Sequence, residues 1–441
     1  MKTILKYALL YITIAALFLG GLLLVSYIPK DAIEDNVRES AEIMVKEGEG
    51  KSFSSLGRVI FNDNSTDAIM INLSYTIDED NRLESIVKAR RNYIPGVTKE
   101  ITNDLVGDLP HETERYAMTV ELLNTVNGKE QMSYEYTRYW HGYIVILRIL
   151  LLFFNITTIR WIIQITLIVL LIILMYYLKK NVSLKVAIAL IVAFIATDIS
   201  VWVYTIQGMF VMIIAVLVSI FIANQKINEK NMNVWLFVSG ALTAYLDFLT
   251  TPLVSLLLPI IIYTAINNKE TTFKTECMSL IKNSFAWGFG YFGLWAAKWV
   301  IADLLYDMEI ILLSFVQIYY RMGGIREFDI GSVGLHGLLR NVVNSTNILV
   351  VAVYALIYIY AMARIDLYKK GYFLSSEKLP YYFAFLIPFI WYYAISEHSY
   401  QHFFFTYKTM LIPMLAITFI VLDDRKGKYL LKKKKKEEKN D

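Results

Sequence analysis

The sequence predicts an all-α polytopic membrane protein of about ten transmembrane helices, with a mostly helical extracytoplasmic domain after the first helix. Hydrophobic residues make up 56% of the 441 residues, more than a soluble domain of this size can hide. Long apolar runs alternate with short charged loops, and one polar stretch of about 110 residues interrupts them between Pro29 and Trp140. The bilayer is therefore expected to be the main solvent of the chain.

A hydrocarbon core about 30 Å thick requires roughly 20 apolar residues for each helical crossing. The first apolar segment is too long for the core of a signal peptide and has no clean cleavage site, so residues 1–28 are expected to stay as an anchor. A cleaved signal is the alternative. We expect a transmembrane helix in each of the segments 7–28, 160–178, 185–204, 207–224, 233–249, 252–267, 284–304, 346–364, 380–396 and 409–422.

Basic residues predict the orientation, because loops rich in Lys and Arg stay on the cytoplasmic side. Every second loop is basic, from Lys2 and Lys6 before the first segment to the lysine run 432–436 near the end. Ten spans in a plasma membrane with both termini cytoplasmic give this alternation. The tail 423–441 is expected to be a basic cytoplasmic segment that contacts anionic lipids. No aromatic or groove-reading pattern accompanies its lysines, which argues against a nucleic-acid partner.

The polar stretch then belongs to an extracytoplasmic domain over 29–143, followed by a multi-span domain over 144–422. Between Pro29 and Trp140 this stretch carries 21 acidic against 13 basic residues. Apolar residues at helical spacing predict helices over 32–45 and 67–75, and polar turns are expected at 124–129. The only cysteine, Cys277, falls in a predicted cytoplasmic loop. A disulfide framework within one chain is therefore excluded, and the domain folds by packing alone.

Motifs of soluble catalysis are missing from the sequence. It has no GxxxxGK[ST] phosphate loop, no HExxH zinc helix and no GxSxG elbow. The string GFGYFG at 288–293 matches GxGxxG but lies inside an apolar span. Close helix packing explains its glycines better than phosphate binding.

Ionisable and hydrogen-bonding residues gather near the predicted outer ends of the spans. A charge buried there costs at least about 2.5 to 3.5 kcal/mol, so each one calls for an explanation. Lys and Arg in such a layer would hold a lipid phosphate, while a carboxylate activates a hydroxyl acceptor. The residues that we expect to bind substrate are Arg138, His141, Asp198, Asp247, Lys298, Glu397, His398, His402, Tyr407 and Lys408.

Structural interpretations compete with this one. Asp198 and Lys298 fit a buried ion pair between two spans. The aromatic side chains of Tyr139, Trp140 and Tyr143 are typical of an interfacial belt. His398 and His402, four residues apart, fit a metal site on a helix, although no third clear ligand accompanies them.

One transmembrane helix, a large outer loop, a re-entry segment and many further spans together resemble the GT-C superfamily of membrane glycosyltransferases. These enzymes transfer a sugar from a polyprenyl-phosphate carrier at the outer face. The strings FNDNSTDAIMINLSY at 61–75 and IPKDAIED at 28–35 look like places for the family's acidic base in the first outer loop. The stretch RYWHGYIVILRILLLFF at 138–154 looks like its re-entry segment, although Gly142 stands where the family often has a proline pair.

The resemblance implies an inverting transfer with a carboxylate base, for which Asp67 and Asp63 are the first choices and Asp35 and Asp31 come next. The partners would be a polyprenyl-phosphate-linked sugar and the bilayer. No spacing demands a cofactor, and a divalent metal stays open. A transporter or flippase of lipid-linked saccharides and a non-catalytic membrane partner or sensor remain as alternatives. The predicted outer loop 306–344 fits a lid or a plain surface loop.

Overall fold

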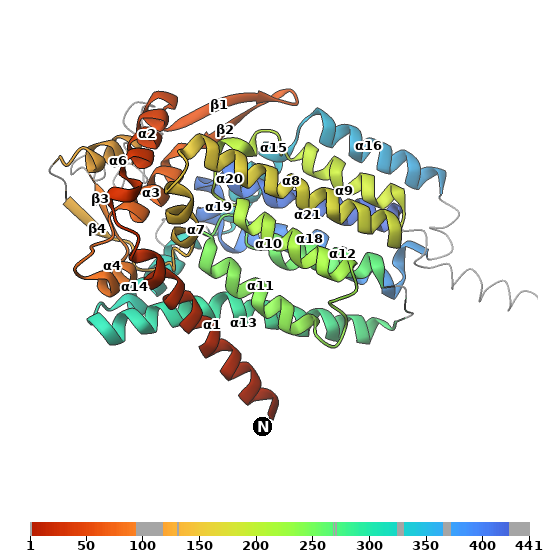
Figure 1. The fold of residues 1–441 in the computed structure, drawn as a ribbon. Helices are drawn as coiled ribbons and strands as arrows, with labels where there is room; N and C mark the ends of the chain where they lie inside the picture. Colours follow the sequence, from red (N-terminus) through yellow and green to blue (C-terminus); the bar gives the residue numbers. More distant parts are fainter. Residues whose placement is uncertain are drawn as a thin grey trace, which may run out of the picture.

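The computed structural model describes residues 2–93, 118–129, 132–267, 269, 271–323, 330–364 and 372–422. Its fold is mostly helical, and a small mixed region lies at one end of a large helix bundle (Figure 1). The basic tail 423–441 lies outside the described residues. The mixed region contains α2 (Asp31–Glu47), β1 (Gly50–Ser55), β2 (Arg58–Asp63), α3 (Asn64–Tyr75), α4 (Arg82–Lys88), β3 (Arg90–Tyr93), α6 (Met118–Val126) and β4 (Met132–Glu135).

Two helices of the mixed region, α2 and α3, confirm the helices expected over 32–45 and 67–75. Two antiparallel pairs of strands were not expected: β1 pairs with β2, and β3 pairs with β4. The β1–β2 turn runs through Leu56 and Gly57, both with positive φ (49° and 82°). A two-residue hairpin turn of this kind usually has the sequence Asn-Gly or Asp-Gly. Here leucine stands in the first position, so the sequence did not indicate a hairpin.

All ten predicted apolar segments contain a helix. The bundle consists of α1 (Lys2–Ser26), α7 (Tyr143–Leu151), α8 (Ile156–Asn181), α9 (Leu184–Ala196), η1 (Trp202–Tyr204), α10 (Met209–Ala223), α11 (Met232–Leu246), α12 (Val254–Ile266), α13 (Phe273–Tyr306), α14 (Ile310–Arg321), α15 (Ile330–Ser345), α16 (Ile348–Ala363), η2 (Tyr372–Leu374), η3 (Ser376–Lys378), α18 (Leu379–Ala394), α19 (Ser396–Gln401), α20 (Phe403–Thr406), η4 (Tyr407–Met410) and α21 (Leu411–Leu422).

By length and composition, three helical segments among the described residues could each cross a membrane: Tyr7–Ser26, Ile156–Asn181 and Phe403–Leu422. A fourth candidate is the bent pair Gly334–Ser345 and Ile348–Ala363, whose two parts meet at 91°. Other apolar helices, such as α9 and α12, have only 13 residues. The described part of the chain thus has three or four candidate membrane-crossing helices beside several shorter apolar ones.

Helix α14 has its apolar side outward, opposite to a helix on a water-soluble protein. Leu312 and Phe315 are more than 60% exposed, whereas Ser314 is buried. The helix lies in the stretch expected as the outer loop 306–344, of which 324–329 falls outside the described residues. An apolar environment outside α14 explains this reversal, and lipid supplies one.

Basic loops meet at the end of the bundle opposite the mixed region. The Asn181 side chain at the end of α8 donates to the Ala223 carbonyl at the end of α10, at 2.6 Å. Lys269, after α12, lies 3.3 Å from Glu229, before α11. The successive helices therefore alternate in direction, and the basic side chains between them gather at one end.

A buried arginine joins the end of α1 to the mixed region. Arg148 in α7 is 1% exposed, and its guanidinium donates to the carbonyl oxygens of Val25, Ile28 and Ser74. These carbonyls lie at or just after the ends of α1 and α3, where the helix dipole concentrates negative partial charge. The cation is thereby satisfied without a carboxylate.

Glycines allow α11 and α13 to touch backbone to backbone. A Cβ on Gly240 would lie 2.2 Å from the Trp287 carbonyl oxygen, and one on Gly290 would lie 2.1 Å from that of Phe237. This confirms the packing interpretation of the GFGYFG string at 288–293. Only a hydrogen fits at either contact.

Three aromatic side chains at the start of the stretch 138–154 are buried, so their interpretation as an interfacial belt is wrong. Tyr139, Trp140 and Tyr143 are each at most 4% exposed. Gly142 explains why no proline pair stands here: its N–H donates to the Tyr245 carbonyl at 2.7 Å, which proline cannot do. A Cβ on Gly142 would also lie 2.3 Å from the Tyr245 ring.

The first prediction concerns the α11–α13 contact. Gly290→Val forces the two backbones apart, and overpacking of this kind costs about 1–3 kcal/mol. We expect a lower thermal melting temperature for the purified protein in detergent. Gly288→Val is the matched control, because its Cβ meets only the Phe292 ring at 3.9 Å. Equal melting temperatures for the two variants would contradict the packing role of Gly290.

Candidate functional site

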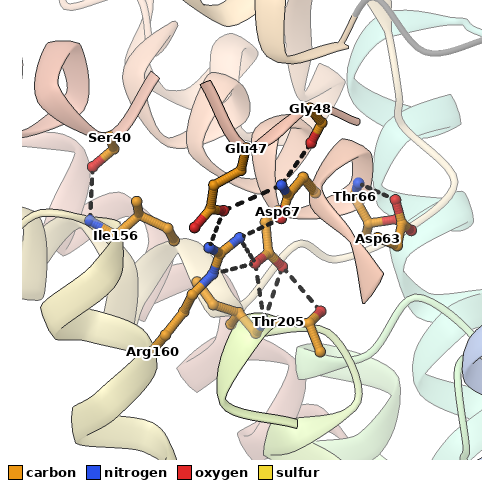
Figure 2. Close-up of polar contacts among 11 residues, drawn as sticks. Ser40, Glu47, Gly48, Asp63, Thr66, Asp67, Ile156, Arg160 and Thr205 are labelled. Carbon is orange, nitrogen blue, oxygen red and sulfur yellow. Dashed lines mark hydrogen bonds and ion pairs between the residues drawn. The ribbon is translucent and has the colours of Figure 1, made fainter. Parts of the chain in front are cut away.

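A buried ion pair lies where the mixed region meets the bundle (Figure 2). Arg160, near the start of α8, donates to the Asp67 carboxylate from Nε at 3.0 Å and from a terminal nitrogen at 2.8 Å. The backbone N–H of Ile206, before α10, donates to the same carboxylate at 2.9 Å. Asp67 is 0% exposed. Both of its oxygens are therefore engaged, and this first-choice base is enclosed in structural contacts.

Neighbouring polar groups complete the centre. The other terminal nitrogen of Arg160 donates to Glu47 at 3.0 Å, and the terminal nitrogen that binds Asp67 also donates to the Asn64 side-chain oxygen at 2.9 Å. Asp63 caps α3, since its carboxylate accepts from the N–H and the hydroxyl of Thr66 (Figure 2). Burial raises the pKa of Asp63. Its oxygens bind no cation within the described residues. The Asp63 carboxylate therefore has more acceptor positions left for a ligand than that of Asp67.

The β1–β2 hairpin contributes a second buried ion pair. Arg58 pairs with Asp198, which also accepts from the Ser55 hydroxyl at 2.6 Å. Asp198 has a φ of 65° in the turn after α9. The alternative interpretation, an ion pair between Asp198 and Lys298, is therefore wrong, because the hairpin reaches over the bundle and supplies the partner.

Two cations near this hairpin retain free donors. The Nε and one terminal nitrogen of Arg58 are buried and have no acceptor. Its guanidinium lies 4.7 Å from the centre of the Tyr407 ring. The next residue, Lys408, is 4% exposed, and its ammonium lies over the Trp202 ring at 5.3 Å. Within the described part of the chain, Lys408 forms no hydrogen bond or ion pair.

Histidines form a separate polar group around Arg321. An Arg321 nitrogen donates to His398 Nδ1 at 2.6 Å, and the other terminal nitrogen donates to the Tyr139 hydroxyl at 2.9 Å. Because arginine only donates, Nδ1 is the acceptor and Nε2 carries the hydrogen that goes to the Leu249 carbonyl at 2.8 Å. His398 is therefore neutral with both nitrogens in use, and it cannot bind a metal as it stands.

His141 is fixed in the same way. Its Nε2 lies 2.7 Å from the Tyr136 carbonyl, which can only accept, so Nδ1 accepts from the Tyr143 hydroxyl at 2.7 Å. The His402 ring stacks on Phe405, with centroids 5.1 Å apart. No group of three His, Cys, Asp or Glu residues among the described ones is arranged to hold a metal.

The other expected residues serve local structure. Lys298 donates to the Ile86 and Val87 carbonyls at the end of α4, at 3.2 and 2.6 Å. Asp247 caps the turn before α12 through the N–H and hydroxyl of Thr250. Arg138 lies over the Tyr136 ring at 5.5 Å, and Glu397 accepts from the Gln401 amide at 2.5 Å.

The predicted layer thus separates into two groups at the same end of the bundle. Asp63, Asp67, Asp198, Tyr407 and Lys408 belong to the group under the hairpin, and Lys408 is within electrostatic reach of all three carboxylates. Asp35, the third expected base, is exposed on α2.

Sequence reasoning overlooked the two most connected cations, Arg148 and Arg160. Each stands alone in an apolar string, ILRILL and TIRWII, where a single charge is costly. The cost of a lone charge in an apolar string was the feature of the sequence that could have identified both arginines as buried and bonded. Arg58 gave no such signal, because its surroundings in the sequence are ordinary for an exposed turn.

In comparisons with protein-family models, with curated proteins and with solved structures, no match was found.

The second prediction concerns the ion pair between Asp67 and Arg160. Removing one partner of a buried pair leaves an uncompensated charge, so Asp67→Asn should lower the unfolding free energy by about 3–5 kcal/mol. Arg160→Gln should act similarly, and the double variant should cost less than the sum. Chemical denaturation followed by tryptophan fluorescence measures these values.

The exposed pair of Lys269 and Glu229, with side chains 71% and 67% exposed, provides the control. Glu229→Gln should change stability by less than about 1 kcal/mol. If Asp67→Asn proved as harmless as Glu229→Gln, the proposed role of the buried pair would be wrong.

Proposed function

We propose that the chain is a GT-C-type membrane glycosyltransferase that moves a sugar from a polyprenyl-phosphate carrier to a hydroxyl acceptor. The observation that carries this proposal is the Lys408 side chain, which is 4% exposed and forms no hydrogen bond or ion pair with the described residues, beside the buried free donors of Arg58. An unpaired buried cation costs several kcal/mol, whereas neighbouring buried charges such as Arg160 are fully paired. A ligand phosphate would supply the missing acceptor.

A phosphate suits this pair of cations better than a neutral ligand. Arg58 offers N–H groups in a planar fork, which matches phosphate oxygens, and Lys408 adds a compact charge. Both cations border Tyr407, since Arg58 lies over its ring and Lys408 follows it in η4. Asp198 neutralises only one side of Arg58. Two cations with free donors therefore lie beside Tyr407.

Asp63 is the carboxylate that we propose as the base. Its interaction with Thr66 uses one lone pair on each oxygen, and a carboxylate has about four acceptor positions. Burial raises the pKa of Asp63, which makes the ionised carboxylate a stronger base. Asp67 is less suitable, because Arg160 and Ile206 occupy both of its oxygens.

In the proposed reaction, the acceptor hydroxyl gives its proton to Asp63 while its oxygen attacks the anomeric carbon. The bond between that carbon and the carrier phosphate breaks, and the electron pair leaves with the phosphate. Lys408 and Arg58 stabilise the negative charge that develops there. A single displacement inverts the anomeric centre and needs only one base.

The proposal includes the ten-span topology, with both termini cytoplasmic and this site near the opposite face. Two features support it. Basic loops gather at the end of the bundle away from Lys408, as the positive-inside rule requires. Helix α14 also presents its apolar side outward. Its last residue, Arg321, contacts Tyr139, so this apolar surface lies at the same end of the bundle as the polar groups.

The third prediction tests the activity. The protein is reconstituted in liposomes with polyprenyl-phosphate monosaccharides, and release of free polyprenyl phosphate is measured. We expect Asp63→Asn to lower the rate by about 10²–10⁴-fold and Lys408→Met to lower it by about 10²–10³-fold. Glu42→Gln, an exposed carboxylate on α2, is the matched control and should keep the wild-type rate.

Melting temperatures separate loss of activity from loss of fold. If folded Asp63→Asn and Lys408→Met released polyprenyl phosphate at the wild-type rate, the roles assigned to Asp63 and Lys408 would be wrong. Absence of release from every donor, together with movement of labelled lipid between leaflets, would refute the transferase and favour a flippase.

A further inference from the structure

A groove lies between α1, α11 and α13, at the end of the bundle where the basic loops gather. Helix α1 crosses α13 obliquely, and its N-terminal end stands away from the bundle (Figure 1). The two helices touch at Tyr11, whose hydroxyl donates to the Gly293 carbonyl at 2.6 Å. Toward the N-terminus of α1 they diverge and leave a volume of about 420 Å³, lined by Tyr7, Phe237, Ile281, Phe285, Ala286 and Phe289.

The walls of this groove are apolar and open. The Phe285 side chain is 75% exposed and that of Phe289 is 56% exposed, while the Tyr7 and Phe237 rings meet edge to face at 6.1 Å. The volume falls within the range of about 300–1,000 Å³ that is usual for ligand sites. Such a surface favours a hydrocarbon chain and offers almost nothing to a sugar.

Polar groups occur only at the rim. Lys282 and Asn233 complete the lining. Lys282 is exposed and forms no ion pair with the described residues. Helix α11 begins beside Asn233, and its N-cap residue Asn231 provides no side-chain cap, so the positive end of the helix dipole lies at this rim. A cation and a positive helix end at the mouth of an apolar groove complement an anionic headgroup.

We propose that this groove binds an anionic glycerophospholipid of the cytoplasmic leaflet. One acyl chain lies along Phe285 and Phe289, and the phosphate contacts Lys282. Charge complementarity identifies the lipid class, because anionic lipids are drawn to basic segments at the membrane surface. The bound chain would fill the gap under α1 and hold its free N-terminal half against the bundle.

This site is separate from the proposed sugar-transfer site. Asn233 and Asp247 stand at opposite ends of α11, about 21 Å apart at 1.5 Å per residue. Lys408 lies at the Asp247 end of the bundle, with the carboxylates under the hairpin. A lipid at Lys282 is therefore not the sugar donor at Lys408. The inference rests on the topology given in the proposed function, but not on the transfer of a sugar.

The fourth prediction tests this lipid site by native mass spectrometry of the full chain in detergent, titrated with phosphatidylglycerol or phosphatidylcholine. We expect one tight phosphatidylglycerol, bound at least about tenfold better than phosphatidylcholine. Lys282→Glu should abolish this preference. Lys274→Glu, on the same helix outside the lining, should retain it.

A second variant tests the apolar part. Ala286→Trp fills the groove and should displace the tight lipid of either class, whereas Val300→Trp, at another exposed position of α13, should not. Tight binding that survives both Lys282→Glu and Ala286→Trp would overturn the proposal. Equal affinity for the two lipids would overturn the assignment to an anionic headgroup.

Discussion

The ion pair between Asp67 and Arg160 is the contact on which the rest of the architecture depends. It joins three parts of the chain that are far apart in sequence: α3 of the mixed region, the start of α8 and the loop before α10. Neither charge reaches water, so each is stable only while the other is in place. The mixed region is thereby held in one orientation on the bundle, and the hairpin that leads into α3 is positioned over Asp198 and Tyr407.

Helix ends explain several of the other buried charges. Arg148, Lys298 and Lys378 donate to carbonyls at or near the C-terminal ends of helices, whereas the carboxylate of Asp63 accepts from the N–H of Thr66 at the start of α3. Each charge lies at the end of the helix dipole that favours it. The polar layer is therefore largely structural, and Lys408 and the free side of Arg58 are exceptions to it under the hairpin. Their missing acceptors, more than the number of charges, indicate where an anionic ligand belongs.

Sequence patterns located much of this structure. The ten apolar segments all contain helices, α2 and α3 lie where helical spacing placed them, and Gly290 and Gly293 of the GFGYFG string lie at contacts between helices. Each of these features depends only on the composition and spacing of residues within one stretch of chain. Such features can be predicted from the local sequence. The alternative pairing of Asp198 with Lys298 was wrong for the opposite reason. Its partner Arg58 comes from a hairpin 140 residues earlier in the sequence, and no local pattern shows that the hairpin crosses the bundle.

The sequence by itself determined that the chain is apolar and mostly helical, that a polar region follows its first helix, and that charged residues recur at one end of the apolar segments. Only the tertiary structure decided which of those charges are satisfied. Asp67 and Asp63 stand four residues apart in one string, yet the first is bound to Arg160 and the second only caps its helix. Reactivity and binding depend on the partners that surround a group, and these partners are brought together by long-range packing that the order of residues does not display.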